Sequence, residues 1–229
     1  MSSGILGLFL LLAASLHFIS TSNDSSAALN DKRTEQRVEI DNSAVVKEEA
    51  GKKQYANPPE MTIDVNKSYQ ARFKTNKGDF TVELYAKAAP KTVNNFVFLA
   101  REGFYDDIVF HRIIKTFMVQ TGDPTGTGTG GPGYQFEDEL SSQYTYEPGI
   151  VAMANAGPDT NGSQFFICTG EDSKSLDQFP NYTIFGRVTD GMDTVLKIAD
   201  TRVERSKITG EESQPAEKVI IESIIISES

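Results

Sequence analysis

One short stretch of the chain sets a single guanidinium and a long amide among apolar side chains. Residues 110–123 read Phe-His-Arg-Ile-Ile-Lys-Thr-Phe-Met-Val-Gln-Thr-Gly-Asp, so Gln120 follows Arg112 by eight residues. An arginine keeps its proton at physiological pH and cannot act as a general base, but its planar guanidinium donates hydrogen bonds from a rigid fork. The stretch therefore favours a site that binds and polarises a neutral group over a site that attacks a bond.

A second stretch has the features of a peptide-binding edge. Residues 153–166 read Met-Ala-Asn-Ala-Gly-Pro-Asp-Thr-Asn-Gly-Ser-Gln-Phe-Phe. The small residues on both sides of Asn155 let a ligand approach the backbone, whose peptide groups could pair with an extended peptide. Gln164 and Phe166 alternate with Phe165 and are expected on one face of a strand. The two stretches together predict a site for an extended chain.

Nucleophilic catalysis would depend on very few residues. The chain has one cysteine, Cys168, and two histidines, of which His17 lies in an N-terminal apolar run. Cys168 follows three apolar residues, which favours a small residue of the core. His111 neighbours Arg112, and adjacent strand residues face opposite sides, so His111 is expected to face the core or its edge if Arg112 faces the site. A hydrolase using Cys168 and His111 is a disfavoured alternative.

Two further patterns are interpreted as structure rather than chemistry. Residues 126–131 fit the letters of a dinucleotide fingerprint, but Pro132 and Gly133 follow and prevent the helix that such a site needs. We interpret this segment as a surface loop. Asp123 and the acidic residues 137–139 lack a histidine partner and the spacing of a calcium loop, so a solvated acidic face is predicted.

The composition fits one soluble globular domain with extensions. The chain has 229 residues, of which 38% are apolar and 24% charged, and its formal net charge is −10. An acidic chain without a basic cluster is not expected to bind nucleic acid. A single cysteine excludes an internal disulfide framework and a cysteine-rich metal site.

The N-terminal part of the chain has the pattern of an export signal followed by a tether. Residues 4–20 form an uncharged apolar run of roughly 17 residues, which suits a signal-peptide core and is at the short limit for a membrane span. We predict a signal peptide over residues 1–22, with an uncleaved membrane anchor as the alternative. Residues 23–60 are polar and lack periodic apolar positions, so they are predicted to be a disordered linker.

Residues 61–229 are predicted to fold as a mainly β domain. Residues 69–75 and 80–85 alternate apolar and polar residues around a turn, which indicates a hairpin. Pro90 begins a helix that Gly103 ends, and a second helix is expected after Asp190. Further strands are expected at 108–114, 117–120, 149–154, 164–169, 183–188 and 219–226. Many short strands with only two helices favour a closed β-barrel.

Three motifs in this order resemble the cyclophilins. They are Phe-His-Arg-Ile-Ile…Phe-Met-Val-Gln…Gly-Asp, then Met-Ala-Asn-Ala-Gly…Thr-Asn-Gly-Ser-Gln-Phe-Phe-Ile, then Leu-Asp…Phe-Gly-Arg-Val. The resemblance covers about residue 68 to the C-terminus. Cyclophilins are peptidyl-prolyl cis-trans isomerases built on a closed eight-stranded antiparallel β-barrel with two capping helices, so this fold and this activity are what the resemblance implies.

The resemblance also implies the roles of individual residues. Arg112 corresponds to the catalytic arginine, Gln120 to the glutamine that orients it, and Asn155 to the residue whose backbone grips the substrate. The pocket for the proline ring would be formed by Phe117, Met118, Phe166 and Leu176. The groove would be lined by Ala154, Ala156, Gln164 and Tyr182.

Two positions depart from the pattern of many eukaryotic cyclophilins. Ser175 stands where those proteins carry a tryptophan, and Tyr182 stands where they carry a groove histidine. Both departures resemble bacterial-type members and argue against tight binding of cyclosporin. Catalysis is expected to survive, because Arg112 and the apolar pocket are present.

The resemblance together with the N-terminal apolar run leads to the hypothesis of an isomerase that assists the folding of exported proteins outside the cytoplasm. It would be secreted or extracytoplasmic, or held at the membrane by residues 4–20. We expect a monomer that acts on proline-containing polypeptides and unfolded client proteins, without a cofactor or metal. A non-catalytic module that binds proline peptides is the rival hypothesis, and loss of the arginine would have favoured it.

Overall fold

The structure is a computed structural model that describes residues 53–141 and 143–229. The predicted signal peptide and most of the predicted linker lie outside the described residues. Tyr55, near the end of the predicted linker, is buried. Its ring packs edge-on against the ring of Phe98, with the two ring centroids 5.1 Å apart. Its backbone N–H donates to the Pro132 carbonyl at 2.8 Å, so the last residues before Met61 pack on the domain. In the part of the chain described, no helix is long and apolar enough to cross a membrane.

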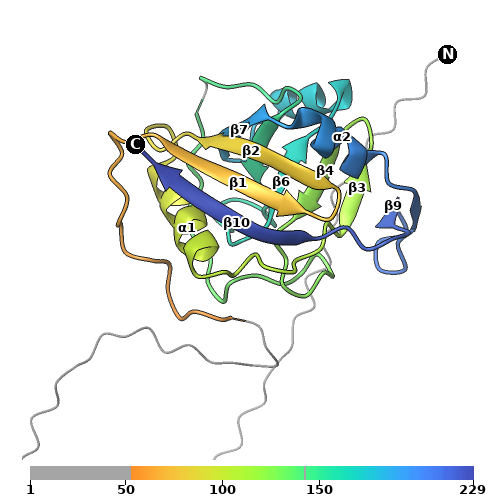
Figure 1. Cartoon of the computed structure of the whole chain (residues 1–229), viewed down its shortest axis with the longest axis horizontal. Helices are drawn as coiled ribbons and strands as arrows, with labels where there is room; N and C mark the ends of the chain where they lie inside the picture. Colours follow the sequence, from red (N-terminus) through yellow and green to blue (C-terminus); the bar gives the residue numbers. More distant parts are fainter. Residues whose placement is uncertain (1–52, 142) are drawn as a thin grey trace, which may run out of the picture. The chain divides into compact units, whose positions relative to one another are not determined.

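The domain is built on one eight-stranded antiparallel sheet (Figure 1). The strand order is β10-β1-β2-β7-β5-β6-β4-β3. The strands are β1 Tyr69–Thr75, β2 Gly78–Leu84, β3 Arg112–Ile114, β4 Met118–Thr121, β5 Ile150–Met153, β6 Phe165–Cys168, β7 Ile184–Asp190 and β10 Ile221–Glu228. A separate two-stranded sheet pairs β8 Val203–Arg205 with β9 Glu212–Pro215. The helices are α1 Pro90–Arg101, α2 Met192–Ala199 and the 3₁₀ helix η1 Glu171–Gln178.

The sheet curls into a half-barrel rather than closing fully. Its edges are β3 and β10, which approach each other through an isolated bridge between Val109 and Ile220. The Phe110 N–H donates to the Val219 carbonyl at 2.9 Å. Because β3 is three residues long and begins beyond this bridge, the two edges do not pair along their lengths. The expected closed barrel is therefore an overstatement, although the eight antiparallel strands and two α-helices are confirmed.

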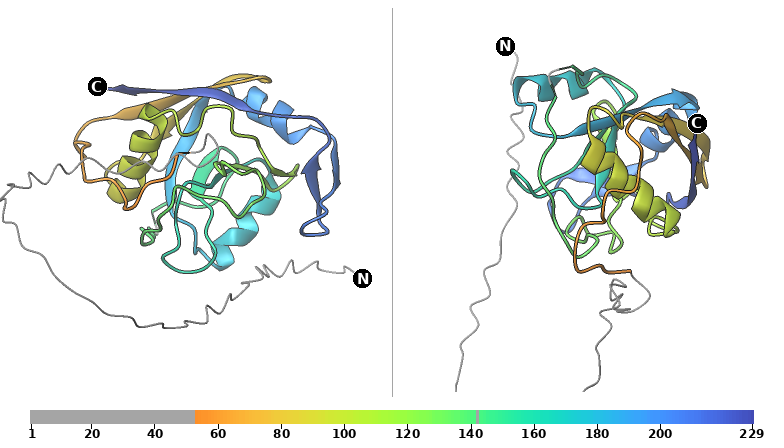
Figure 2. Two further views of the ribbon diagram at one scale, coloured as in Figure 1. Left: turned by 90° about the horizontal axis from the view of Figure 1, so that it is seen from below. Right: turned by 90° about the vertical axis from the view of Figure 1, so that its left-hand side faces the viewer.

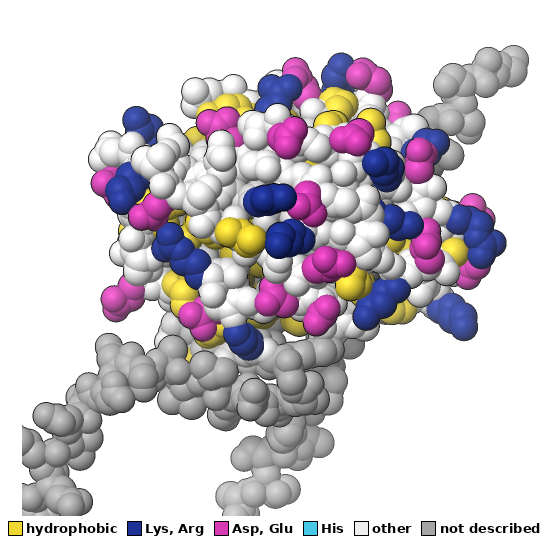
Figure 3. Space-filling view, viewed as in Figure 1, with side chains coloured by type: hydrophobic (Ala, Val, Ile, Leu, Met, Phe, Trp, Pro, Cys, Tyr) yellow, Lys and Arg dark blue, Asp and Glu magenta, His cyan; other side chains and the backbone are white. Residues whose placement is uncertain are grey.

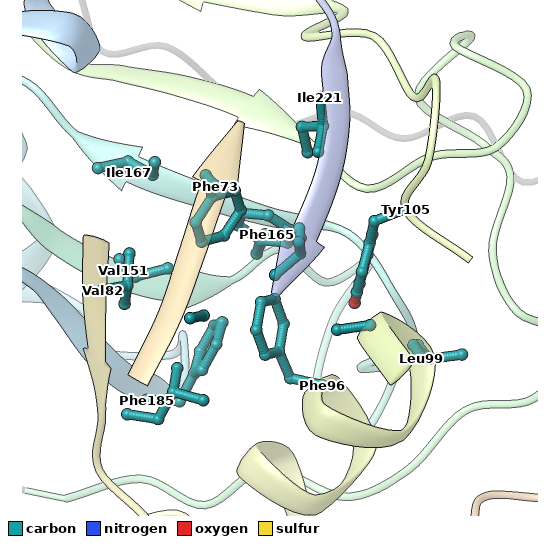
Figure 4. Packing of buried hydrophobic residues seen from close by; sticks show 14 of the residues in the cluster. Phe73, Val82, Phe96, Leu99, Tyr105, Val151, Phe165, Ile167, Phe185 and Ile221 are labelled. Carbon is teal, nitrogen blue, oxygen red and sulfur yellow. The ribbon is translucent and has the colours of Figure 1, made fainter. Parts of the chain in front are cut away.

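The larger core lies between the sheet and α1. Pro90 begins α1 at a position where no backbone donor is needed, and the helix buries an apolar face on the strands. Phe96 projects from α1 toward Phe165 and Phe185, with ring centroids 5.6 and 5.4 Å away (Figure 4). Strand β1 buries alternate residues, which places Phe73 in this core, stacked on Phe80 at 4.5 Å. This packing fixes the sheet on which the site is built.

A smaller apolar cluster covers the other face of β4, β5 and β6. Strands β5 and β6 are buried at every residue, because odd and even positions enter different cores. Phe165 and Ile167 of β6 belong to the larger core, whereas Phe166 and Cys168 belong to the smaller cluster. Apolar residues on both faces explain why β6 reads as a continuous apolar run rather than an alternating one.

The hairpin of β8 and β9 is set apart from the main sheet. It lies at the opposite end of the domain from α1 in Figure 1 and in the left view of Figure 2. Strand β9 lies beside β3, at the edge of the main sheet that carries Arg112. The hairpin therefore lies beside the sheet edge that carries the predicted site.

Candidate active site

Strand register brings two of the three predicted catalytic residues, Arg112 and Gln120, onto one face. Arg112 of β3 lies opposite Gln120 of β4, Gln120 lies opposite Phe166 of β6, and Phe166 lies opposite Ala152 of β5. Directly opposed residues of antiparallel strands project from the same face of the sheet. The guanidinium, the amide and the aromatic ring thus form one row across three strands, over the smaller apolar cluster.

The predicted proline pocket is part of this smaller cluster. Its members Met118 and Phe166 are buried and form a floor. The residues packed at its margin include four predicted ones: Phe117, Ala154, Leu176 and Tyr182. The ring of Tyr182 meets that of Phe166 edge-on, with centroids 5.6 Å apart. The structure therefore brings all four predicted pocket residues together, with Tyr182 as a side wall.

Tyr146 holds this wall in place and was not predicted. Its hydroxyl donates to the Tyr182 carbonyl at 2.7 Å and accepts from the Tyr182 N–H at 3.1 Å. Burial raises the pKa of the Tyr182 phenol, and the charge of Arg112 opposes that rise, so the phenol is protonated at neutral pH. The sequence around Tyr146 gives no sign of its contact with Tyr182, which lies 36 residues further along the chain.

A chain of side-chain amides ends at the guanidinium. Gln164 donates through Nε2 to the carbonyls of Gly128 and Gly130 at 3.0 and 2.9 Å. These bonds direct the Gln164 Oε1 toward Gln120, whose Nε2 donates to it at 3.0 Å. The Gln120 Oε1 then accepts from the Arg112 Nη1 at 3.4 Å. Each amide can satisfy this pattern in only one orientation, so the acceptor of Gln120 faces the arginine.

The loop that anchors this chain is held by a buried carboxylate. Asp123 accepts the backbone N–H groups of Thr125, Thr127, Gly128 and Gly130 at 2.6–3.1 Å. Burial raises the pKa of Asp123, but these hydrogen bonds outweigh it and leave the pKa below its ordinary value. The loop donors that could hold a phosphate are thus occupied by the protein's own carboxylate. The segment serves as a surface loop, as predicted.

The segment around Asn155 presents its backbone. The Ala154 N–H donates to the Gln164 carbonyl at 3.0 Å, and the Ala156 N–H donates to the Thr160 hydroxyl at 2.8 Å. The Asn155 side chain donates to the Asn181 carbonyl at 2.9 Å. Among the described residues, no hydrogen bond reaches the backbone N–H or C=O of Asn155. Both peptide groups of this residue can therefore pair with an extended ligand.

Two residues of the predicted acidic face have structural partners instead. Asp138 accepts from the Asn161 side chain at 2.8 Å and from the Asp159 N–H at 2.9 Å. Glu139 accepts the Lys91 and Thr92 N–H groups at 3.0 and 2.8 Å, at the first turn of α1. The prediction of a solvated face was wrong for these two residues, whose partners are distant in sequence. It was also wrong for Asp123, which is buried and accepts hydrogen bonds from its own loop.

The alternative nucleophile and base are poorly suited to catalysis. Cys168 is fully buried, and burial raises the pKa of its thiol to about 12, so the thiolate is scarce at neutral pH. Burial lowers the pKa of His111 to about 4. The described residues contain no group of three or more His, Cys, Asp or Glu side chains that could hold a metal ion.

The site contains one charged residue that the sequence did not indicate. Glu211 immediately precedes β9 and accepts from the Arg112 Nε at 2.7 Å and from Nη2 at 2.9 Å. The hydrogen bond from Arg112 lowers the pKa of Glu211, so the carboxylate is ionised at neutral pH. An acidic residue in a polar turn is typical of a solvent-exposed loop, and no motif connects positions 112 and 211.

Comparisons with known proteins agree with this architecture. A family model described as cyclophilin type peptidyl-prolyl cis-trans isomerase/CLD matches residues 70–226. Peptidyl-prolyl cis-trans isomerase CYP18-2 of Arabidopsis thaliana is 46% identical over 154 residues, which cover 66% of this chain and 86% of the relative. The probable peptidyl-prolyl cis-trans isomerase A of Mycobacterium leprae is 46% identical over 183 residues, covering 73% of this chain and 97% of the relative.

Solved structures give the same result. A cyclophilin-type peptidyl-prolyl cis-trans isomerase of Cryptosporidium parvum superposes with a TM-score of 0.63 at 37% identity, covering 71% of this chain and 99% of that one. A second crystal structure of that protein, in the presence of the dipeptide Ala-Pro, gives a TM-score of 0.62 at 38% identity, covering 70% and 99% of the two chains.

Proposed function

The chain belongs to the cyclophilin-type peptidyl-prolyl cis-trans isomerases, and we propose that its activity assists the folding of exported proteins outside the cytoplasm. Isomerisation of X-Pro bonds takes tens to hundreds of seconds without a catalyst and limits the folding of many chains. The apolar run of residues 4–20, ahead of a polar segment, is the observation that carries the proposal of export.

The chemistry that we assign to Arg112 follows from the nature of the barrier. Rotation about a peptide bond costs about 18–20 kcal/mol because twisting breaks amide resonance. The twist returns the lone pair to the proline nitrogen, which can then accept a hydrogen bond. A guanidinium aimed at that nitrogen interacts strongly only with the twisted state, which is selective stabilisation of the transition state.

The other site residues are assigned to holding the substrate. The apolar floor of Met118 and Phe166 would receive the proline ring, with Phe117 and Leu176 at its sides. The backbone of Asn155 would pair with the substrate chain, because its peptide groups have no partner among the described residues. With the proline ring and the substrate chain held in place, rotation about the X-Pro bond moves the carbonyl group that precedes the proline.

The best-supported feature of this assignment is the row of Arg112, Gln120 and Phe166. Their strand register places a permanent cation, its orienting amide and an apolar floor side by side on one face. Neither a proton relay nor a nucleophile is needed for rotation about a bond. A module that binds proline peptides without catalysis would need the floor but not the oriented guanidinium.

Export can be tested on the full-length chain in the cells that produce it. Fractionation and N-terminal sequencing should find a mature protein outside the cytoplasm that begins near residue 23. An intact N-terminus in the membrane fraction would identify the anchored form. An intact chain in the cytoplasm would refute the proposal. The recovered protein should also accelerate the refolding of a secreted protein whose slow phase is X-Pro isomerisation.

A further inference from the structure

The contact between Glu211 and Arg112 is more specific than a surface ion pair. The carboxylate meets Nε and Nη2 in the bidentate arrangement, with distances of 2.7 and 2.9 Å. Side-chain exposure is 20% for Arg112 and 36% for Glu211. A bidentate pair fixes the plane of a guanidinium as well as its position, which a single hydrogen bond does not.

The part of the guanidinium that Glu211 does not contact faces the apolar floor of the predicted site. Nη1 of Arg112 lies 3.4 Å from the Gln120 Oε1 and 3.7 Å from the Met118 sulfur. Met118 belongs to the apolar floor of the site. The guanidinium is therefore held along one side by a carboxylate and presents its opposite side to the floor.

The turn that carries Glu211 is itself tightly built. The Ser206 N–H donates to the Glu211 carbonyl at 2.7 Å, and the Gly210 N–H donates to the Ser206 carbonyl at 2.8 Å. Gly210 has a φ of +72°, a left-handed conformation that favours glycine, immediately before Glu211. Ser213, two residues further along the chain, is buried. The carboxylate thus approaches Arg112 from a turn closed by two backbone hydrogen bonds.

We propose that Glu211 is a positioning residue that orients Arg112 for isomerisation. The hydrogen bond to Gln120 offers Nη1 one acceptor at 3.4 Å, a long distance for a hydrogen bond. Glu211 adds two charge-assisted bonds that fix the guanidinium plane before the substrate arrives. The Glu211 carboxylate contacts Nε and Nη2 of Arg112, so its effect on a substrate is assigned to the arginine that it orients. The proposal rests on the catalytic role assigned to Arg112.

Saturation kinetics on a short Ala-Pro-Phe peptide test this role with the full chain. Glu211→Ala should lower kcat about tenfold and leave KM within about twofold, because the substrate contacts remain. Glu211→Gln keeps the shape of the side chain and one acceptor but loses the charge. Its kcat should lie between those of the wild type and Glu211→Ala. Glu212→Gln is the matched control: Glu212 is an exposed neighbour on the same hairpin, and its loss should leave kcat unchanged.

A spectroscopic measurement distinguishes orientation from a merely structural effect. The Nε–H signal of Arg112 in an ¹H–¹⁵N spectrum should be sharp and protected from exchange in the wild type and in Glu212→Gln. It should broaden or vanish in Glu211→Ala, while the backbone signals remain dispersed. Should Glu211→Ala fail to fold, the isosteric Glu211→Gln variant supplies the same comparison.

The outcomes separate this proposal from the function itself. A wild-type chain that does not catalyse the reaction would refute the role assigned to Arg112. An active wild type with an equally active Glu211→Ala variant would refute only the positioning role. A Glu211→Ala variant faster than the wild type would also overturn it, because the carboxylate would then restrain the arginine from acting.

Discussion

At the scale of single residues, the site depends on the direction in which a few polar groups point. The motifs predicted Arg112, Gln120 and Gln164 as residues of one site, and the structure joins them in a single hydrogen-bonded chain. The predicted pocket residues also meet in one cluster. Glu211 escaped prediction because its contact with Arg112 spans 99 residues and comes from a turn without a motif.

The amide chain leads to a prediction for Gln164. Gln164→Ala removes the acceptor that fixes the orientation of the Gln120 amide. The amide can then turn its Oε1 away from the Arg112 Nη1. We expect kcat/KM for an Ala-Pro-Phe peptide to fall about three- to tenfold, some 1 kcal/mol of transition-state stabilisation.

Gln143→Ala is the matched control for this prediction, because Gln143 is an exposed glutamine whose side chain is not part of the chain of amides. It should keep the wild-type kcat/KM. Equal activity in both variants would show that the amide chain does not orient the arginine.

At the scale of elements, alternation and turn residues located the long strands, but not the contacts that hold distant elements together. The hairpin of β1 and β2 and the helix from Pro90 appear where the sequence predicts them. The sequences of the 3₁₀ helix η1 and of the hairpin of β8 and β9 are mostly polar and have no regular apolar period. Their polar sequences therefore resemble loops.

The first turn of α1 provides an example of such a distant contact. The residue before the helix, Ala89, has no side chain that can cap it, and no acidic residue lies in the first turn. Glu139 supplies the missing carboxylate by accepting two N–H groups from another loop. A carboxylate at a helix N-terminus is stabilised by the exposed N–H groups and by the helix dipole.

We expect Glu139→Ala to lower the free energy of unfolding by about 1 kcal/mol, measured by urea denaturation. Glu137→Ala is the control on the same loop: Glu137 forms an exposed ion pair with Lys91, and such pairs contribute little. If the two variants lost the same stability, Glu139 would not act as a cap.

At the scale of the whole molecule, the sequence predicted the class of fold better than its closure. Strand number, antiparallel pairing and the two α-helices agree with prediction, whereas full closure depends on how far two edge strands extend. Figure 3 shows acidic and basic side chains mixed over the face that carries β1 and β10. Exposed pairs there, such as Arg72 with Asp79, add little to stability, so the two apolar cores provide most of it.

Acid stability is a property of the whole domain that His111, whose ring nitrogens are buried, should influence. Its two ring nitrogens have no hydrogen-bond partner in the described part of the chain, and burial lowers its pKa to about 4. The unfolded chain therefore binds a proton at His111 more readily than the folded chain does. Above about pH 6.5 the imidazole is neutral in both the folded and the unfolded chain, so it does not affect the free energy of unfolding. That free energy should fall as the pH drops from about 6.5 to 4, because only the unfolded chain gains the proton in this range.

The loss over this window should be on the order of 3 kcal/mol for a shift of this size. Urea denaturation of the wild type and of His111→Gln between pH 7 and 4 measures it. The variant should show a flatter profile, because the carboxylates are common to both proteins and their contributions cancel in the comparison. Parallel profiles would contradict the burial of a neutral His111.

The central claim is that the guanidinium of Arg112 stabilises the twisted X-Pro bond. The direct test is the rate of cis-to-trans isomerisation of an Ala-Pro-Phe peptide by the wild type, by Arg112→Ala and by Arg72→Ala, an exposed arginine of β1. The account predicts that kcat/KM falls by about two orders of magnitude or more in Arg112→Ala, roughly 3 kcal/mol, and is unchanged in Arg72→Ala. A wild type that binds the peptide without accelerating its isomerisation, or an Arg112→Ala variant with full activity, would contradict it.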